Sequence, residues 1–323
     1  MSVTVQNKRC RILLSETAFK DEFLELESWL KSDSKWVFRG HASTNWKLTN
    51  TLERQYKLLC QNSFNEESKC DGNEDNLRKY LSESDDYITD KLEAIEKRLI
   101  TSFKKSIGED CSQDPSLVKY MALMQHYGIP SRLLDFSRSP AIALFFAMCK
   151  QGEKDRDTRR VVWAVNTRPI EAWVEPYKNE LLKQKVCNEV EVETVLADKL
   201  IQDAVTGTQT SLTCRWYPIY MEGNNLRMIA QKGLFMMPLR LGHMEQDFAA
   251  TLGYDYNHEV DCISYTDFKA MSVEETSSLV VISMEFPISS DGRAWSILAD
   301  KGISREKLLP DLSLMGWLKD EIL

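Results

Sequence analysis

Three short blocks of polar residues, each beside an apolar segment, carry the side chains that could do chemistry in this chain of 323 residues. The first block is Trp36-Val37-Phe38-Arg39-Gly40-His41. Trp, Val and Phe favour a pleated strand, and glycine lets another backbone or a ligand come close. A guanidinium at the end of such a strand can donate two parallel hydrogen bonds to a phosphate. We interpret Arg39, Gly40 and His41 as an anion-binding element; the structural alternative pairs Arg39 with a buried carboxylate such as Asp135.

The second block runs from Gln125 to Ser137, with the sequence QHYGIPSRLLDFS. Its polar groups are too many for a connection beside the core to leave without partners. They must therefore bind one another or a ligand. Strand alternation places Asp135 and Ser137 on one face, where an acid and a hydroxyl would lie together. His126, near a helix C-terminus, is biased toward its protonated form, which suits phosphate binding and helix capping equally. Gln125, His126 and Arg132 are therefore candidate ligand-binding residues, and Asp135 and Ser137 are candidate catalytic residues.

The third block runs from Asn225 to Phe235, with the sequence NLRMIAQKGLF. Arg227 and Gln231 lie four residues apart, so they share a face whether the segment is helical or extended. From that face they would contact the amide or phosphate of a ligand, while Gly233 permits a turn or bulge at the strand entrance. We expect Arg227, Gln231 and Phe235 to belong to a ligand site; the alternative is an ordinary solvated surface.

The three blocks, in this order, resemble the FRG domain family. The name motif of that family corresponds to Phe38-Arg39-Gly40, its central signature to QHYGIPSRLLDFS with SPAIALFFA, and its late signature to RMIAQKGLF. Phe136 stands where the family commonly has Trp, which keeps an aromatic ring but removes an indole donor. The resemblance implies a single FRG-type domain with insertions over residues 1–323, and it leaves the activity open.

A weaker similarity connects Phe38-Arg39-Gly40 and Phe136-Ser137 to ADP-ribosyltransferases of the arginine-serine-glutamate type. In that family an Arg-Gly at the end of the first core strand holds the NAD phosphates, and a hydroxyl-bearing strand before a helix shapes the nicotinamide pocket. The similarity implies NAD as the cofactor, with Arg39 on the pyrophosphate and Ser137 beside the nicotinamide. The catalytic glutamate of that family, which lies late in its sequence, has no match here, because the corresponding block has Gln231. Asp135 and Glu222 are the two acids that would replace it.

Two functions from different classes therefore stay open. One is an NAD-using, ADP-ribosyltransferase-like enzyme with Asp135 or Glu222 as its acid. The other is a non-catalytic module that binds a small nucleotide or a nucleic-acid end, as a sensor in bacterial defence or toxin systems would. A plain interaction protein is a third hypothesis, and it requires the polar blocks to be satisfied only by one another.

Composition excludes several other function classes. The chain has 41 Lys+Arg and 49 Asp+Glu, a net charge of −8, so non-specific binding to duplex DNA is not expected, whereas a pocket for one nucleotide is compatible. No apolar run approaches the roughly 18 residues of a membrane span, and the start lacks the apolar region of a secretory signal, so we expect a cytoplasmic protein. The four histidines and eight cysteines show no metal-ligand spacing, so no metal is expected.

The elements that position these blocks follow from apolar periodicity, which predicts an α+β fold with a central mixed or antiparallel sheet, flanking helices and helical insertions. An acidic loop with a long helix, residues 61–110, and a helical segment, residues 170–212, lie outside the blocks and are interpreted as insertions. The long helix would be scaffold or an oligomer contact. The predicted strands are 36–39, 133–137, 160–166, 216–220, 233–239 and 278–286, and the predicted helices include 16–31, 88–103, 116–128, 189–204 and one from Pro140.

Overall fold

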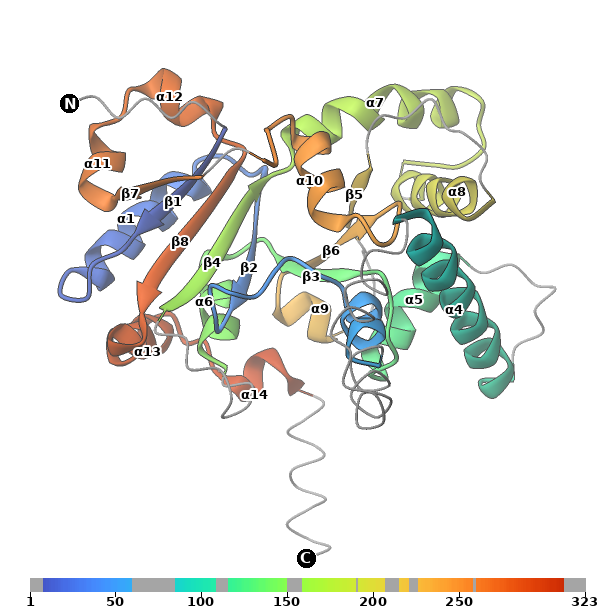
Figure 1. The fold of residues 1–323 in the computed structure, drawn as a ribbon, viewed down its shortest axis with the longest axis horizontal. Helices are drawn as coiled ribbons and strands as arrows, with labels where there is room; N and C mark the ends of the chain where they lie inside the picture. The colour runs from blue at the N-terminus through green and yellow to red at the C-terminus, as the bar shows by residue number, and fades with distance from the viewer. Residues whose placement is uncertain are drawn as a thin grey trace, which may run out of the picture.

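A computed structural model describes residues 8–59, 85–108, 116–149, 159–189, 191–206, 215–220, 226–257 and 260–310. In these residues the chain forms one eight-stranded sheet in the order β5-β6-β3-β2-β4-β8-β1-β7, surrounded by helices (Figure 1). The strand β1 is parallel to both of its neighbours and every other pair is antiparallel, so the sheet is mixed and the predicted α+β class is confirmed. The strands are β1 (Arg9–Leu13), β2 (Trp36–His41), β3 (Leu134–Ser137), β4 (Arg159–Asn166), β5 (Trp216–Ile219), β6 (Gly233–Pro238), β7 (Asp261–Ser264) and β8 (Val281–Pro287).

The main apolar core lies against one face of β2, β4, β8 and β1. Alternation turns Phe38, Val162 and Ile282 to this face, where they pack against three helices. The helices are α1 (Phe19–Lys31), α6 (Pro140–Met148) and α13 (Asp291–Asp300). The helix α6 is apolar on nearly every side, as its sequence AIALFFAM predicts, because it fills the space between the sheet and α13.

Gly40 is required where α6 crosses β2. A Cβ atom at this position would lie 1.8 Å from the carbonyl oxygen of Ala143 and 2.6 Å from the main-chain nitrogen of Ala147. Both contacts are with main-chain atoms of α6, which cannot rotate away. Gly40 therefore permits the backbone of α6 to approach β2 closely.

The sheet opens between β2 and β3. The two strands pair only through Phe38 and Ser137, whereas β2 pairs with β4 along its whole length and β3 pairs with β6 along its whole length. Beyond that pair, the end of β2 that carries Arg39, Gly40 and His41 separates from β3. This separation leaves room for side chains from both strands to face a common space.

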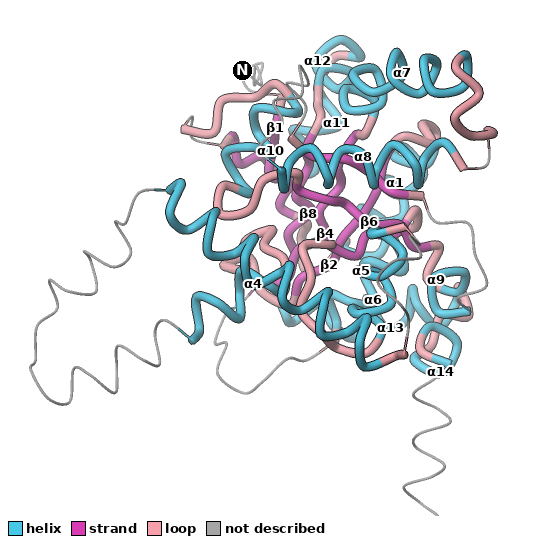
Figure 2. The backbone as a smooth tube through the Cα atoms, turned by 90° about the vertical axis from the view of Figure 1, so that its right-hand side faces the viewer, coloured by secondary structure: helices cyan, strands magenta, loops and turns pink. Residues whose placement is uncertain are grey.

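A second apolar cluster lies at the other end of the sheet, around β5 and β6. The helices α4 (Asp85–Ser106), α5 (Leu117–His126), α7 (Arg168–Lys183) and α8 (Val192–Thr206) gather there, and Figure 2 shows α4 and α8 on the same side of the molecule. Phe103 of α4 and Ile201 of α8 are buried in this cluster. The described parts of the two predicted insertions thus contribute to a core. Residues 61–84, 109–110, 190 and 207–212 of those segments lie outside the described residues.

The other helices surround the edges of the sheet. They are the helical segment 51–59, α9 (Leu226–Ala230), α10 (Met244–Leu252), α11 (Tyr265–Ala270), α12 (Val273–Ser278), the short 3₁₀ helix η1 (Ile288–Ser290) and α14 (Arg305–Leu308). Of the helices in the described ranges, none combines the length and the apolar character that crossing a bilayer would need.

Candidate functional site

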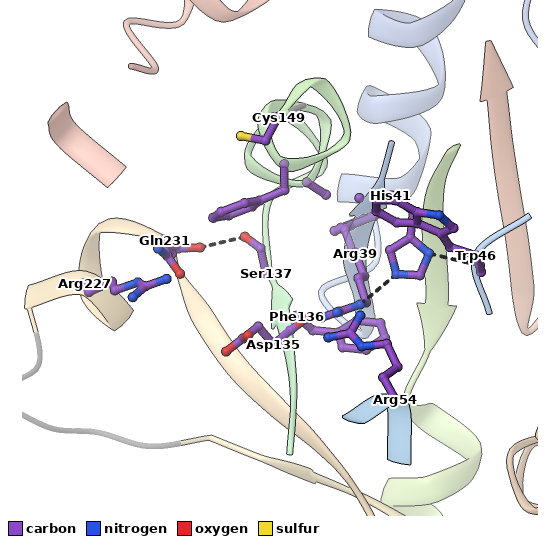
Figure 3. Close-up of a pocket in the computed structure, with 14 residues that line it drawn as sticks. Arg39, His41, Trp46, Arg54, Asp135, Phe136, Ser137, Cys149, Arg227 and Gln231 are labelled. Carbon is purple, nitrogen blue, oxygen red and sulfur yellow. Dashed lines mark hydrogen bonds between the residues drawn. The ribbon is translucent and has the colours of Figure 1, made fainter. Parts of the chain in front are cut away.

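A pocket of about 240 Å³ lies where β2 and β3 separate, and we call it the arginine pocket. Its walls come from β2, β3, α6, α9 and residues 46 and 54, so all three polar blocks of the sequence meet there (Figure 3). The lining residues are Phe38, Arg39, Gly40, His41, Trp46, Arg54, Asp135, Phe136, Ser137, Ala143, Phe146, Cys149, Arg227 and Gln231.

Arg39 is held at the centre of this pocket by uncharged partners. Its Nε donates a hydrogen bond of 3.0 Å to Nε2 of His41, and its Nη1 donates to the main-chain carbonyl of Asp135. Burial lowers the pKa of Arg39 to about 10, an effect that the Asp135 carboxylate opposes and Arg54 reinforces. Within the described residues no carboxylate forms an ion pair with Arg39. Its charge is therefore desolvated without being neutralised, a state that a bound anion would relieve.

His41 positions Arg39 and brings no charge of its own. Burial, assisted by the neighbouring Arg39, lowers the pKa of His41 to about 3, so the imidazole is neutral at physiological pH. Its Nδ1 lies 3.2 Å from the carbonyl oxygen of Trp46 and carries the proton, which leaves Nε2 to accept from Arg39. His41 thus joins the end of β2 to the loop that holds Trp46.

Two further arginines make the pocket positive. Arg54 comes from the helical segment 51–59, and Arg227 comes from α9 on the opposite wall (Figure 3). Burial lowers the pKa of Arg54 as well, with the attraction of Asp135 acting against it. Among the described residues that line the pocket, three guanidinium groups therefore face one carboxylate, that of Asp135. Such a charge balance favours a ligand with more than one negative charge.

The two candidate catalytic groups of β3 line the same pocket but differ in environment. Asp135 is exposed, and its Oδ2 accepts a 2.7 Å hydrogen bond from Nε2 of Gln125. Ser137 is buried; its hydroxyl donates to the carbonyl of Gln231 at 2.7 Å and accepts from the main-chain N–H of Ser139 at 3.0 Å. The Ser137 hydroxyl therefore already connects β3 to the turn before β6 and to the start of α6.

The late block contributes two residues to the pocket wall and one to the core. Gln231 is buried beside the pocket, and its Nε2 donates to the carbonyl of Leu308 at 3.0 Å, which fixes α9 against α14. Arg227 lies on α9 and lines the pocket. Phe235 lies instead in the second apolar cluster, with 3% of its surface exposed, so the expectation that it contacts a ligand is corrected.

Arg132 also has a role different from the expected one. Its side chain is 0% exposed, its Nε and Nη2 donate to the carboxylate of Glu96, and its Nη1 donates to the carbonyls of Pro238 and Leu239. These bonds attach β3 to α4 and to the end of β6. The expectation that Arg132 binds a ligand is corrected, because its guanidinium is sealed in the core and its donors are occupied.

Of the remaining candidates, Gln125 contacts a pocket residue, His126 is not among the residues that line the pocket, and Glu222 lies outside the described residues. Gln125 supports Asp135 and also accepts a hydrogen bond from Ser131 at 3.0 Å. His126 lies in the last turn of α5, with its ring 5.5 Å from that of Tyr127. Glu222 belongs to the part of the chain that is not described. Over the described ranges, no cluster of three or more His, Cys, Asp or Glu side chains is placed to hold a metal ion.

Five residues of the pocket did not stand out individually in the sequence. They are Trp46, Arg54, Ala143, Phe146 and Cys149. The apolar run from Pro140 predicts burial for Phe146 of α6 and for Cys149, which directly follows α6, but not that either side chain reaches a pocket. Arg54 has no motif around it; only the return of the chain after β2 brings it next to Arg39.

The family model of the FRG domain matches residues 34–156, a range that contains β2, β3 and α6 and therefore Arg39, Asp135 and Ser137. Neither a curated protein nor a solved structure matches the chain.

Proposed function

The chain contains an FRG domain, and on that premise we propose that its arginine pocket binds the phosphate groups of a nucleotide. One observation carries the proposal: the desolvated guanidinium of Arg39 faces an open pocket, is oriented by His41 and by a main-chain carbonyl, and has no carboxylate paired with it in the described residues. Arginine is suited to this task because its planar fork matches two phosphate oxygens.

The other walls favour a phosphorylated ligand that carries a ring over a free inorganic anion. Trp46, Phe136 and Phe146 supply aromatic surface, and the guanidinium of Arg39 lies 6.0 Å from the centre of the Phe136 ring. Pockets for cofactors typically combine such apolar walls with a few placed charges. NAD is the dinucleotide that the resemblance to ADP-ribosyltransferases favours.

Cleavage of NAD is the second candidate function, supported by the presence of Asp135 in the same pocket as Arg39. Loss of nicotinamide leaves a positively charged ribosyl group, which a fixed carboxylate stabilises. Asp135 would serve as this carboxylate, with Ser137 in the wall beside it. A non-catalytic nucleotide sensor would use the same arginines without turnover.

Thermal denaturation with added ligands tests the binding proposal. We expect NAD, ADP-ribose or ADP to raise the melting temperature of the wild type, because a ligand that binds only the folded state stabilises it. Arg39→Gln should abolish the increase. Arg168→Gln is the matched control, since Arg168 is exposed and pairs with Asp33 away from the pocket. If none of the three ligands stabilises the wild type, the proposal is wrong.

Nicotinamide release separates the two functions. Wild type and Asp135→Asn are incubated with NAD and free nicotinamide is quantified. Release by the wild type that Asp135→Asn abolishes supports the enzyme, provided that NAD still stabilises the variant. Stabilisation by NAD without any release supports the sensor.

A further inference from the structure

A second pocket, of about 150 Å³, shares Trp46 with the arginine pocket. We call it the aromatic pocket, because five aromatic side chains contribute to its walls. Its lining residues include members of β1, β4, β8 and α10. The lining residues are Arg9, Thr44, Asn45, Trp46, Lys47, Leu48, Trp163, Met244, Glu245, Phe248, Tyr254, Tyr256 and Val281.

Two residues that line this pocket carry hydrogen-bond donors that are buried and unused. Nε of Arg9 and Nε1 of Trp163 have no partner in the described part of the chain. The guanidinium of Arg9 lies 5.5 Å from the centre of the Trp163 ring and 5.7 Å from that of Tyr254, so ring contacts fix its position. Folded proteins pair nearly all of their buried N–H groups, and the exceptions concentrate where a ligand or water completes the set.

The carboxylate of this pocket is already occupied. Glu245 accepts a hydrogen bond of 2.7 Å from Lys47 and one of 3.1 Å from the hydroxyl of Tyr256. Its charge is thereby balanced at the rim, while Arg9 adds a positive charge inside. The pocket therefore favours a ligand group that accepts hydrogen bonds, and it disfavours a cation.

We infer that the aromatic pocket binds the base of the nucleotide whose phosphates bind in the arginine pocket, an inference that rests on the proposed function. Planar heterocycles stack on aromatic side chains, and ring nitrogens or carbonyl oxygens of a base would accept from Trp163 and Arg9. An apolar cavity of about 150 Å³ holds a benzene ring, so the aromatic pocket has room for one base. Trp46, which lines both pockets, places the base site next to the phosphate site.

Calorimetric titrations with ligands that have or lack a base test this inference. Wild type is titrated with pyrophosphate, ADP, GDP and UDP, and the affinity gained over pyrophosphate measures the contribution of the ribose and the base together. Trp163→Phe keeps an aromatic ring and removes Nε1–H, and Arg9→Gln removes the guanidinium. Each should reduce that gain about fivefold, the value of roughly one hydrogen bond, and leave pyrophosphate binding unchanged. Trp173→Phe, an exposed position on α7, is the matched control and should change neither.

The outcomes separate this inference from the proposed function. If pyrophosphate binds and no nucleoside diphosphate binds more tightly, the base site is wrong and the phosphate site stands. The same conclusion follows if the gain persists in both Trp163→Phe and Arg9→Gln, with circular dichroism showing that both variants are folded. If neither pyrophosphate nor any nucleotide binds the wild type, the proposed function fails together with the base site.

Discussion

Arg39 and Arg132 belong to neighbouring polar blocks of the sequence, yet they lie in opposite environments. Arg132 is sealed in the core and pairs with Glu96 through two of its nitrogens, whereas Arg39 faces an open pocket and is held by His41 and a carbonyl. The difference depends on Glu96, which α4 supplies from 36 positions earlier in the chain. A polar block thus shows where charged groups gather, and long-range packing decides which of them remain accessible to a ligand.

Breaking the sealed pair should have the largest effect. Arg132→Met leaves the Glu96 carboxylate buried without a partner, and we expect a loss of about 3–5 kcal/mol in the free energy of unfolding. Urea denaturation measures this loss. The double variant Arg132→Met/Glu96→Leu removes both charges and should recover much of the stability. A single variant as stable as the wild type would contradict the assignment of Arg132 to the fold.

Gly40→Ala should have the next largest effect, because it forces α6 away from the strand that carries Arg39. The added methyl group would lie 1.8 Å from the Ala143 carbonyl oxygen, and overpacking of this kind costs about 1–3 kcal/mol. Gly292→Ala is the matched control, since no atom lies within 4 Å of its Cβ position. Thermal denaturation of the two variants should show a lower melting temperature only for Gly40→Ala; equal melting temperatures would contradict the close approach of α6.

Arg54→Gln extends the comparison to the second arginine of the open pocket. The residue as a whole is exposed and only its guanidinium is partly desolvated at the pocket wall, so we expect no loss of stability. Its charge lies at the same pocket as that of Arg39 and would contact the same ligand. A charge-assisted hydrogen bond contributes about 1.5–3 kcal/mol, and even the lower value corresponds to about a tenfold loss in affinity for ADP. Calorimetric titration measures that loss. Unchanged affinity, with a reduced melting temperature, would place Arg54 with Arg132 among the structural arginines.

At neutral pH His41→Gln should have the smallest effect on stability, and the variant should differ from the wild type mainly in the pH dependence of stability. The pKa of His41 is about 3 in the folded protein and 6.5 ordinarily, so below pH 6.5 the unfolded chain takes up a proton that the folded chain does not. This contribution to stability is present above pH 6.5 and is lost as the pH falls toward 3. Melting temperatures between pH 7.5 and 4.5 should therefore decline less steeply in His41→Gln than in the wild type. Equal slopes would show that His41 is not held neutral.

The sequence predicts most of the elements that carry the site, because their signals are local. Strand propensity and a following glycine locate β2, helical spacing that ends at Gly128 predicts α5, and the apolar run after Pro140 predicts α6. The sequence does not predict the strands β1 and β7; they form by parallel pairing of β1 with β7 and β8, segments far away in the chain, which no local signal indicates.

Which residues line the site is harder to predict from the sequence. Arg54 and Trp46 reach the pocket through the path of the chain after β2, and no spacing rule describes that path. Arg132 and Phe235 stand in the correct blocks but point into the core, because Glu96 and the second apolar cluster bury them. The side chains of one block thus divide between a pocket and a core according to partners far away in the chain.

The central claim is that Arg39 binds a ligand, whereas Arg132 stabilises the fold. The most direct test compares the free energy of unfolding of wild type and Arg39→Gln, each with and without saturating ADP. We expect Arg39→Gln to be at least as stable as the wild type without ligand, because it removes a desolvated charge, and only the wild type to gain stability from ADP. A large loss of stability in Arg39→Gln without ligand, together with no gain from ADP in the wild type, would show that Arg39 is a structural arginine like Arg132.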